Sequence, residues 1–383
     1  MAKVTLGEVA VECRESCRGD KSGLPAVGLE HLTPGQIRLS SWAVNTENTF
    51  TKLFRRDDML FGRRRAYLKK AAQAPFDGIC SGDITVIRAR PGKLLPELLP
   101  FIIQNDDLFD FAVGRSDGSL SPRVKWENLA NYTFELPPLA EQKKLAEVLW
   151  SISDTIQAYQ DLLTKTEELV KARFAELFGN IFDNPKGFQT CRFGDYVRQM
   201  NIGPFGSDLK NDCFVSKEDG YCMVYEQKHA IDKDISVEAR YVTEQKYWQM
   251  MRFDIGPGDI IVSCRGTIGK CFLLPEDAPH GIIHPSLMMI KPKDTVNHEF
   301  LLFLLENILK EQQEQGTGVK MAIKAAELAK IVCVAPPRQL QDEYVAFVNQ
   351  ADQSKSALQR TITSLQETKR SLAAEALCMG RKE

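Results

Sequence analysis

The densest group of cationic side chains in this sequence lies between residues 52 and 70. Guanidinium and ammonium groups can bind nucleic-acid phosphates, and arginine can also form two hydrogen bonds with a guanine edge. The group comprises Lys52, Arg55, Arg56, Arg63, Arg64, Arg65, Lys69 and Lys70. We select all of them except Lys52 as candidate nucleic-acid ligands. The structural alternative is a solvated β edge whose charges oppose aggregation.

Smaller sets of candidate ligands occur elsewhere in the chain. Lys320 and Lys324 follow the glycine-rich segment Gly316-Thr317-Gly318, which could lie along a phosphate backbone. Alternatively, these two lysines lie in the first turn of a surface helix, and the sequence does not decide between the two arrangements. The further candidates are Arg115, Ser116, Lys125, Ser207, Lys210, Arg265, Lys270, Lys320 and Lys324.

The sequence lacks the motifs that several classes of enzyme require. No Gly-x-Gly-x-x-Gly follows a strand pattern, and no Walker A loop occurs. An amino-methyltransferase would need an Asn/Asp-Pro-Pro-aromatic motif, whereas this chain has Asn184-Pro185-Lys186-Gly187-Phe188. No pair of nucleophile and base can be identified either. We therefore predict no catalytic residue and no cofactor.

The ten cysteines form no Cys-x-x-Cys pair, and several lie inside apolar runs. This pattern favours reduced, buried thiols in a cytoplasmic protein. A zinc site at Cys264, Cys271, His280 and His284 is the alternative, but prolines beside the histidines exclude a helical ligand pair, and we predict no metal.

With no run of 18 apolar residues and no signal-peptide pattern, we expect no membrane span. The net charge of −2 requires that any nucleic-acid surface be local.

The chain contains a repeat whose two copies are offset by 199 residues (336 − 137). Pro137-Pro138 opens a long helical pattern in the first copy, and Pro336-Pro337 opens another in the second. Apolar residues recur there with steps of mostly four and three, which indicates a heptad seam. The first seam consists of Leu145, Leu149, Ile152, Ile156, Tyr159, Leu163, Val170 and Leu177. The same offset gives a second seam from Tyr344 to Ala376 without a gap.

Each long helix follows a segment with the same order of features. Leu6-Gly7-Glu8-Val9 corresponds to Phe193-Gly194-Asp195-Tyr196, and β patterns, one helical stretch (Leu95–Phe111 or Glu299–Gln315) and a glycine-rich loop follow. The predicted architecture is α/β. Two similar globular domains alternate with two long helices that pair with each other as an antiparallel coiled coil. The predicted boundaries are 1–138 for the first domain, 139–180 for the first helix, 187–335 for the second domain and 338–380 for the second helix.

At three places the residues resemble the specificity subunit of type I restriction–modification systems. The stretch Pro137-Pro-Leu-Ala-Glu-Gln-Lys-Lys-Leu resembles the segment that follows a target recognition domain in that family. Gly258-Asp-Ile-Ile-Val-Ser-Cys-Arg-Gly-Thr-Ile-Gly-Lys resembles the signature inside such a domain, and Gly203-Pro-Phe-Gly-Ser-Asp-Leu-Lys resembles the loop near its start. The first domain departs from the signature, because Gly62-Arg-Arg-Arg-Ala-Tyr stands where the second has Ser263-Cys-Arg-Gly-Thr-Ile.

The resemblance implies a non-catalytic subunit whose two target recognition domains bind the two halves of a bipartite target in double-stranded DNA. It also implies that the helices space the domains and dock two methyltransferase subunits, and that a restriction/translocase subunit can join. The alternatives are a scaffold that does not touch DNA and a self-contained DNA methyltransferase or nuclease. For Arg64 we expect contact with phosphate, because three consecutive arginines on a strand cannot all face one groove.

Overall fold

The computed structural model describes residues 2–45, 47–315 and 324–377, and the chain divides into two compact units. The first unit contains residues 1–164 and 356–383, and the second contains residues 165–355. The division cuts both long helices, α5 (Leu139–Phe178) and α10 (Arg338–Ala376). Each unit therefore consists of one globular part and one segment of each long helix.

The globular part of the first unit is built on a four-stranded antiparallel sheet. A smaller sheet contains one parallel pair, formed by β3 and β7. All four residues of β5 are buried, as its short continuous apolar run predicts. The larger sheet has the order β2 (Ala10–Cys13), β8 (Ile84–Ala89), β5 (Met59–Gly62) and β6 (Ala71–Gln73), and the smaller has the order β3 (Ala26–Val27), β7 (Gly78–Cys80) and β4 (Lys52–Phe54).

The second unit repeats this topology, with a four-stranded antiparallel sheet and a smaller sheet that contains one parallel pair, β14 and β19. Its added edge strand, β15, corresponds in the first unit to a single bridge between Ala26 and Ala43. The larger sheet has the order β13 (Val197–Ile202), β20 (Leu287–Pro292), β17 (Ile260–Ser263) and β18 (Cys271–Leu273), and the smaller has the order β15 (Arg240–Val242), β14 (Cys222–Tyr225), β19 (Gly281–Ile283) and β16 (Asp254–Ile255). The predicted α/β class and the duplication are both confirmed.

A two-stranded antiparallel ribbon precedes each long helix. In the first unit β1 (Ala2–Thr5) pairs with β11 (Thr133–Leu136), and in the second β12 (Gln189–Arg192) pairs with β21 (Val332–Ala335). Short helices and one hairpin complete the units. These are α1 (Leu6–Val9), α2 (Leu99–Ile103), α3 (Asp106–Gly114), β9 (Ser116–Asp117), β10 (Arg123–Val124), α4 (Trp126–Leu129), α6 (Gln227–Asp232), α7 (Glu244–Met250), α8 (His298–Gln315) and α9 (Ala325–Leu328), with single 3-10 turns at Leu29–His31, Ala66–Leu68, Phe193–Tyr196, Asn211–Cys213 and Met251–Phe253.

The helical stretch expected between residues 95 and 111 is two helices in the structure. α2 ends at Ile103, and α3 begins at Asp106. Between them, the side-chain oxygen of Asn105 accepts a hydrogen bond from the Asp107 amide at 2.8 Å. An asparagine cap of this kind satisfies an amide at a helix start and so favours a new helix. The corresponding α8 of the second unit is continuous.

The heptad prediction for the long helices is confirmed by burial. Every predicted seam position of α5, from Leu145 to Leu177, is buried or half-buried, and so is every position of the α10 seam. Lys369 occupies one of the α10 seam positions, and burial lowers the pKa of its ammonium group. The exposed apolar residues of α5, such as Leu169, lie outside the seam.

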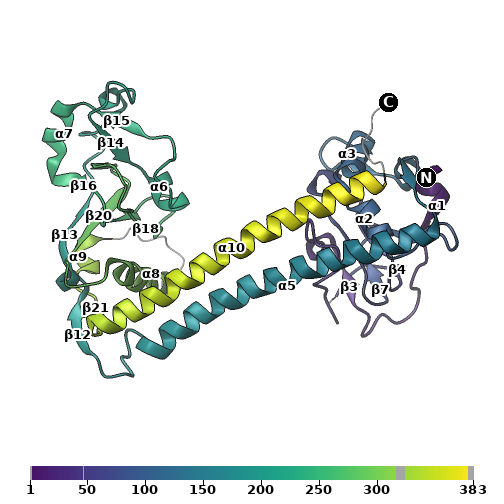
Figure 1. Cartoon of the computed structure of the whole chain (residues 1–383), viewed down its shortest axis with the longest axis horizontal. Coiled ribbons are helices and arrows are strands. Elements are labelled where there is room, and N and C mark those ends of the chain that lie inside the picture. The colour runs from purple at the N-terminus through teal and green to yellow at the C-terminus, as the bar shows by residue number, and fades with distance from the viewer. Residues whose placement is uncertain (1, 46, 316–323, 378–383) are drawn as a thin grey trace. The chain divides into compact units, whose positions relative to one another are not determined.

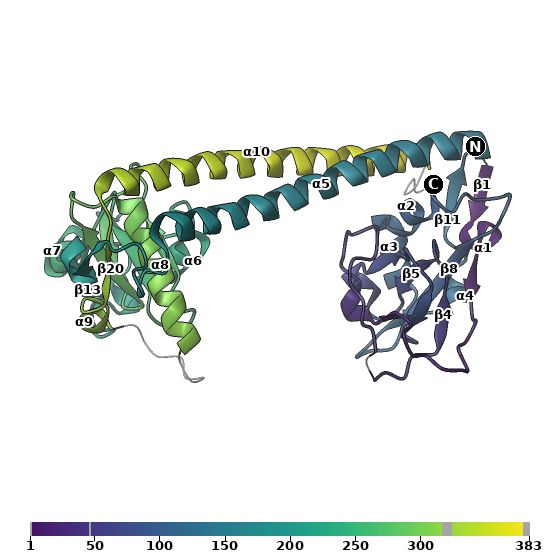
Figure 2. The ribbon, with the colours of Figure 1, turned by 90° about the horizontal axis from the view of Figure 1, so that it is seen from below.

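In both units the segments of α5 and α10 are antiparallel (Figures 1 and 2). In the second unit the end of α5 packs on the start of α10, where the ring centroids of Phe174 and Tyr344 are 5.4 Å apart. In the first unit Leu149, near the start of α5, shares a hydrophobic core with Leu372 and Ala373 near the end of α10. The expected antiparallel pairing within one chain is thus confirmed.

A buried glutamine fixes the first turn of each long helix to the globular part before it. The side chain of Gln142 donates to the Pro137 carbonyl at 2.9 Å and accepts a hydrogen bond from the Leu95 amide at 3.0 Å. Gln341 makes the same two bonds, to the first proline of its own pair at 2.9 Å and from the Asn297 amide at 2.9 Å. Because a buried amide must be paired, this geometry explains the glutamine that both Pro-Pro motifs share.

Cysteines introduced at Arg173 and Glu343 should cross-link within one chain. These side chains form an ion pair across the seam of the second unit, so a short bis-maleimide can join the two positions. The expected yield does not change on dilution, because the reaction is intramolecular. Peptide mass spectrometry identifies the product, with the parent chain and both single-cysteine variants as controls. A product that forms only between chains, with a yield that falls on dilution, would contradict the pairing.

Candidate nucleic-acid interface

The three consecutive arginines of the first unit do not lie on a strand. β5 ends at Gly62, and Arg65 has a left-handed backbone conformation (φ 55°) that begins the short helix Ala66–Leu68. We expected the alternation of side chains along a strand to prevent the three arginines from facing one groove. The reason given for that expectation is wrong, because these residues do not lie on a strand. The residual strand pairing here is one bridge between Arg64 and Arg123. That bridge ties the arginine segment to the β9–β10 hairpin.

Arg64 and Arg123 share one carboxylate. The Arg64 guanidinium lies 3.4 Å from one oxygen of Asp83, and Nε of Arg123 donates to the other oxygen at 2.7 Å. Burial would raise the pKa of Asp83, but the hydrogen bond from Arg123 and the charges of both arginines lower it below its ordinary value. Two cations on one carboxylate leave a net positive charge, and Arg65 beside them is exposed. This cluster is suited to binding a phosphate group.

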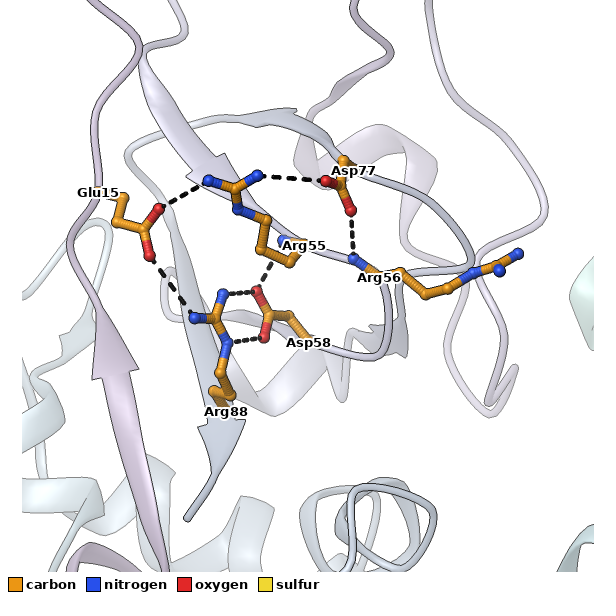
Figure 3. Close-up of polar contacts among 6 residues, drawn as sticks. All are labelled: Glu15, Arg55, Arg56, Asp58, Asp77 and Arg88. Carbon is orange, nitrogen blue, oxygen red and sulfur yellow. Dashed lines mark hydrogen bonds and ion pairs between the residues drawn. The ribbon is translucent and has the colours of Figure 1, made fainter. Parts of the chain in front are cut away.

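Arg55, by contrast, is neutralised by ion pairs inside the unit (Figure 3). Its guanidinium lies 3.3 Å from the carboxylates of both Glu15 and Asp77. The side chain of Asp58 is 1% exposed, accepts a hydrogen bond from the Arg55 amide at 2.7 Å and binds Arg88 with both oxygens. Arg55 therefore belongs to an internal charge network and is less available to phosphate than the arginines that share a carboxylate.

The second unit contains the equivalent of the buried part of this network. Asp259, at the start of β17, accepts a hydrogen bond from the Gly256 amide at 3.0 Å and lies 3.4 Å from Lys291 of β20. Burial raises the pKa of Asp259, and the lysine partly offsets that cost. Recurrence in both units marks the buried acid–cation pair as part of the common fold.

Most of the remaining candidates of the first unit contact a group within the unit. Nε of Arg63 is buried and has no hydrogen-bond partner among the described residues. The amide of Arg56 donates to Asp77, whereas its guanidinium points away from the charge network (Figure 3). The side chains of Lys69 and Lys125 form ion pairs with Asp106 and Asp117, respectively. Those of Lys70 and Ser116 donate hydrogen bonds to the carbonyls of Leu29 and Ala112, respectively. The Arg115 guanidinium lies over the Phe111 ring.

Two candidates of the second unit lie in a turn between β17 and β18 whose backbone is fixed by side chains. Oγ of Ser263 accepts a hydrogen bond from the Lys270 amide at 2.9 Å. Gln227 of α6 donates to the carbonyls of Arg265 at 2.6 Å and Thr267 at 3.2 Å. The side chains of Arg265 and Lys270 are exposed, and neither forms an ion pair with any described residue. The turn therefore presents two free cations on a rigid support.

The loop Gly203–Lys210 lies beside this turn. A Cβ atom at Gly203 would lie 2.3 Å from the His284 carbonyl oxygen, so only glycine permits the approach. Two residues further along, the Ser286 carbonyl accepts a hydrogen bond from the Cys264 amide at 2.8 Å. The two segments that carry the family resemblance in this domain thus meet at one stretch of chain before β20.

A half-buried ion pair supports the same face of the second unit. Arg240 pairs with Glu226, and its guanidinium lies 3.7 Å over the Phe214 ring. Burial would raise the pKa of Glu226, but the hydrogen bond and charge of Arg240 lower it. Burial also lowers the pKa of His284, which keeps this imidazole neutral near pH 7.

The other candidates of the second unit lie outside this turn. Ser207 contacts Asp208 at 3.4 Å, and Lys210 is exposed at the end of its loop. Lys324 precedes α9 and pairs with Glu327 at 2.8 Å, so the helix-start alternative describes its local structure. Lys320 lies outside the described residues.

Two polar residues that organise these clusters were not identified from the sequence. Asp83 is one of 51 acidic residues and belongs to no motif, so its contact with two arginines was not predictable. Gln227 opens a six-residue helix and differs from other surface glutamines only through its tertiary contacts.

Within the described part of the chain, no group of three or more His, Cys, Asp or Glu residues could hold a metal ion. None of the helices described is long and apolar enough to cross a membrane.

Comparison with known proteins gives matches in sequence and in fold. Residues 238–367 match the model of the family described as the type I restriction modification DNA specificity domain. The type I restriction enzyme EcoDI specificity subunit of Escherichia coli is 25% identical over 170 residues, which are 41% of this chain and 38% of that protein. The match thus spans less than half of the curated relative. The family resemblance expected from the motifs is confirmed.

Two solved structures cover nearly the whole chain. One comes from a study of complex assembly and conformational transition of the type I R-M system and has a TM-score of 0.62, with 21% identity over 98% of this chain and 97% of that chain. The other is the type I restriction-modification system S subunit from M. genitalium, with a TM-score of 0.57 and 12% identity over 98% and 96% of the two chains. At these identities the likeness concerns the fold.

Proposed function

We propose that this chain, which carries the type I restriction modification DNA specificity domain over residues 238–367, is the specificity subunit of a type I restriction–modification complex. Each globular part binds one half of a bipartite target in double-stranded DNA. The chain itself is non-catalytic and directs its partners to the target. Because these partners act on genomic DNA, the proposed location is the cytoplasm.

One observation carries the proposal: the two units share a topology but differ in the loop residues that could contact DNA. The segment after β5 has three arginines, one of which shares Asp83 with Arg123, whereas the turn after β17 has the free cations Arg265 and Lys270. A set of strands that both units share, carrying different loops in each, is suited to the recognition of two different half-sites.

The proposed protein partners are two methyltransferase subunits and one restriction/translocase subunit. Each unit contains segments of both long helices, so each can offer a similar helical surface to one copy of the same partner. Exposed apolar residues lie on α5 in both units, Val148 in the first and Leu169 in the second. In this proposal the partners bind the helix faces outside the seam, where these residues lie.

The direct test is base-resolved mapping of DNA methylation in cells with and without this chain. The proposal requires one bipartite motif whose methylation disappears when the chain is absent and returns when it is restored. Unchanged methylation across the genome in the presence of the partner subunits would refute it.

The alternatives give different results with purified components. A scaffold that does not touch DNA would leave the gel shift of the methyltransferase unchanged when the chain is added. A self-contained methyltransferase would transfer label from S-adenosylmethionine to DNA without partners, and we expect no transfer.

The change Arg64→Ala should weaken DNA binding by the assembled complex about equally for all sequences, and should reduce the salt slope by about one. The fold should tolerate the change, because Asp83 keeps its bond to Arg123. The measurement is binding affinity at several salt concentrations. Arg55→Ala is the matched control, since two carboxylates already neutralise that guanidinium, and its slope should change less.

Two other results for Arg64→Ala have defined meanings. A loss of about 1–3 kcal/mol at one target position with an intact salt slope would identify Arg64 as a base reader. Unchanged affinity, specificity and slope would remove the arginine cluster from the interface.

A further inference from the structure

Leu120 is the most exposed of the large apolar side chains in the described residues. It is 90% exposed, and Phe205 follows with 76%. Leu120 lies at the tip of the hairpin formed by β9 and β10, where Gly118 has a positive φ of 106° that supports the reversal of the chain. A single exposed leucine is ordinary by itself. Leu120 differs because the residues that follow it are hydrogen-bonded to the arginine segment.

The tip of the hairpin is fastened to the arginine segment on the side next to Leu120. The Arg64 guanidinium donates to Oγ of Ser121 at 3.1 Å, and the Arg65 amide donates to the Pro122 carbonyl at 2.8 Å. Arg123 follows at once and binds Asp83 together with Arg64. These hydrogen bonds therefore fix the backbone next to Leu120, and the arginine cluster lies beside it.

We propose that Leu120 is an apolar wedge that inserts between two base pairs of the half-site bound by the first unit. The inference rests on the proposed DNA-binding function and names the residue that deforms the DNA. A wedge needs an apolar side chain without internal packing, a support that does not yield, and cations that hold the backbone on either side. Leu120, the fastened tip and the arginine cluster supply these three elements.

Insertion of Leu120 has a consequence for sequence preference. Unstacking one base step costs least at pyrimidine–purine steps, so the first unit would favour such a step at the wedge without a hydrogen bond to either base. This preference would add to any sequence preference that the arginines contribute by contacting bases. Insertion of Leu120 would also bend the duplex at that step.

The experiment uses the assembled complex and duplexes that contain the target found by methylation mapping. 2-Aminopurine replaces each adenine of the first unit's half-site in turn, and permanganate oxidation probes the thymines, because both report unstacked bases. Binding of the parent complex should increase the signal at one step of this half-site in addition to the adenine that the methyltransferase flips out of the stack. Leu120→Ala should abolish the increase at that step, and Leu120→Met, which keeps an apolar wedge, should retain it.

The affinity of Leu120→Ala should fall by roughly tenfold, as for loss of one buried leucine side chain, with the salt slope unchanged. Val44→Ala is the matched control, since it also removes an exposed apolar group from the first unit (47% exposed) and should change neither signal nor affinity. Parent complex that binds the target without unstacking any step besides the flipped adenine, or an alanine variant that unstacks as the parent does, would overturn the wedge but not the function. A parent complex that binds no DNA would instead overturn the proposed function.

Discussion

The change Phe178→Ala is expected to lower the free energy of unfolding of the second unit by about 3–5 kcal/mol. Phe178 is fully buried at the end of α5. Its ring contacts Phe174 on the same helix, Tyr344 on α10 and Phe300 on α8, with centroids 5.0 to 5.5 Å apart. Truncation would leave a cavity where three helices meet, and surrounding aromatic rings cannot collapse into it freely.

The measurement is hydrogen exchange in increasing urea, followed by mass spectrometry of peptides from the second unit, because the two units need not unfold together. Leu169→Ala is the matched control. It lies on the same helix in the same unit but is 56% exposed, so its effect should stay within about 0.5 kcal/mol. A loss below about 1 kcal/mol for Phe178→Ala would mean that this junction does not hold α5 to the second unit.

Exchange of residues 187–335 for the corresponding domain of a relative should change one half of the DNA target and leave the other half intact. Methylation at the original target should fall by roughly a thousandfold or more, the ratio that separates specific from non-specific binding. The exchanged piece keeps both strands of the β12–β21 ribbon. Gln341, which stays behind on α10, bonds the Asn297 amide, and a backbone amide is present in any donor domain.

The donor for this exchange should retain the residues that meet α10 through side chains. Asn297 bonds Asp342, and Glu299 bonds Asn349, so a donor without these groups would disturb the helix as well as the target. The control is the reciprocal exchange of the first domain, which should change the opposite half. A change in both halves, or in neither, would contradict independent recognition by the two domains.

The architecture was predictable because its signals are local or repeated. The burial of the α5 seam follows from heptad spacing, and the offset between the Pro-Pro motifs revealed the duplicated units before any strand was placed. The break between α2 and α3 is also a local feature, because asparagine is a residue type that caps helices and Asn105 does so here. Strand order and the parallel pair of β3 and β7 were not predictable, because a two-residue strand carries no periodic pattern.

The candidate interface was less predictable because charge alone does not show which cations are free. Arg55 and Arg64 are equivalent in sequence terms, yet Glu15 and Asp77 neutralise the first, while the second shares its acid with Arg123. These partners come from distant positions in the chain. The sequence identified the cationic segment, and tertiary contacts determine which of its members can meet a phosphate.

The last described turn of α10 completes the core of the first unit, and this has a consequence for synthesis on the ribosome. Leu377 is fully buried there, and its carbonyl accepts a hydrogen bond from the Glu135 amide at 3.0 Å. After Thr164 is made, the ribosome needs roughly 10–40 s, at about 5–20 residues per second, to reach Leu377. Throughout that interval the nascent first unit exposes Leu149 and its neighbours, because residues 165–355 are translated before the final segment of α10. The first unit is therefore encoded first but cannot complete its core until translation delivers its final helical segment.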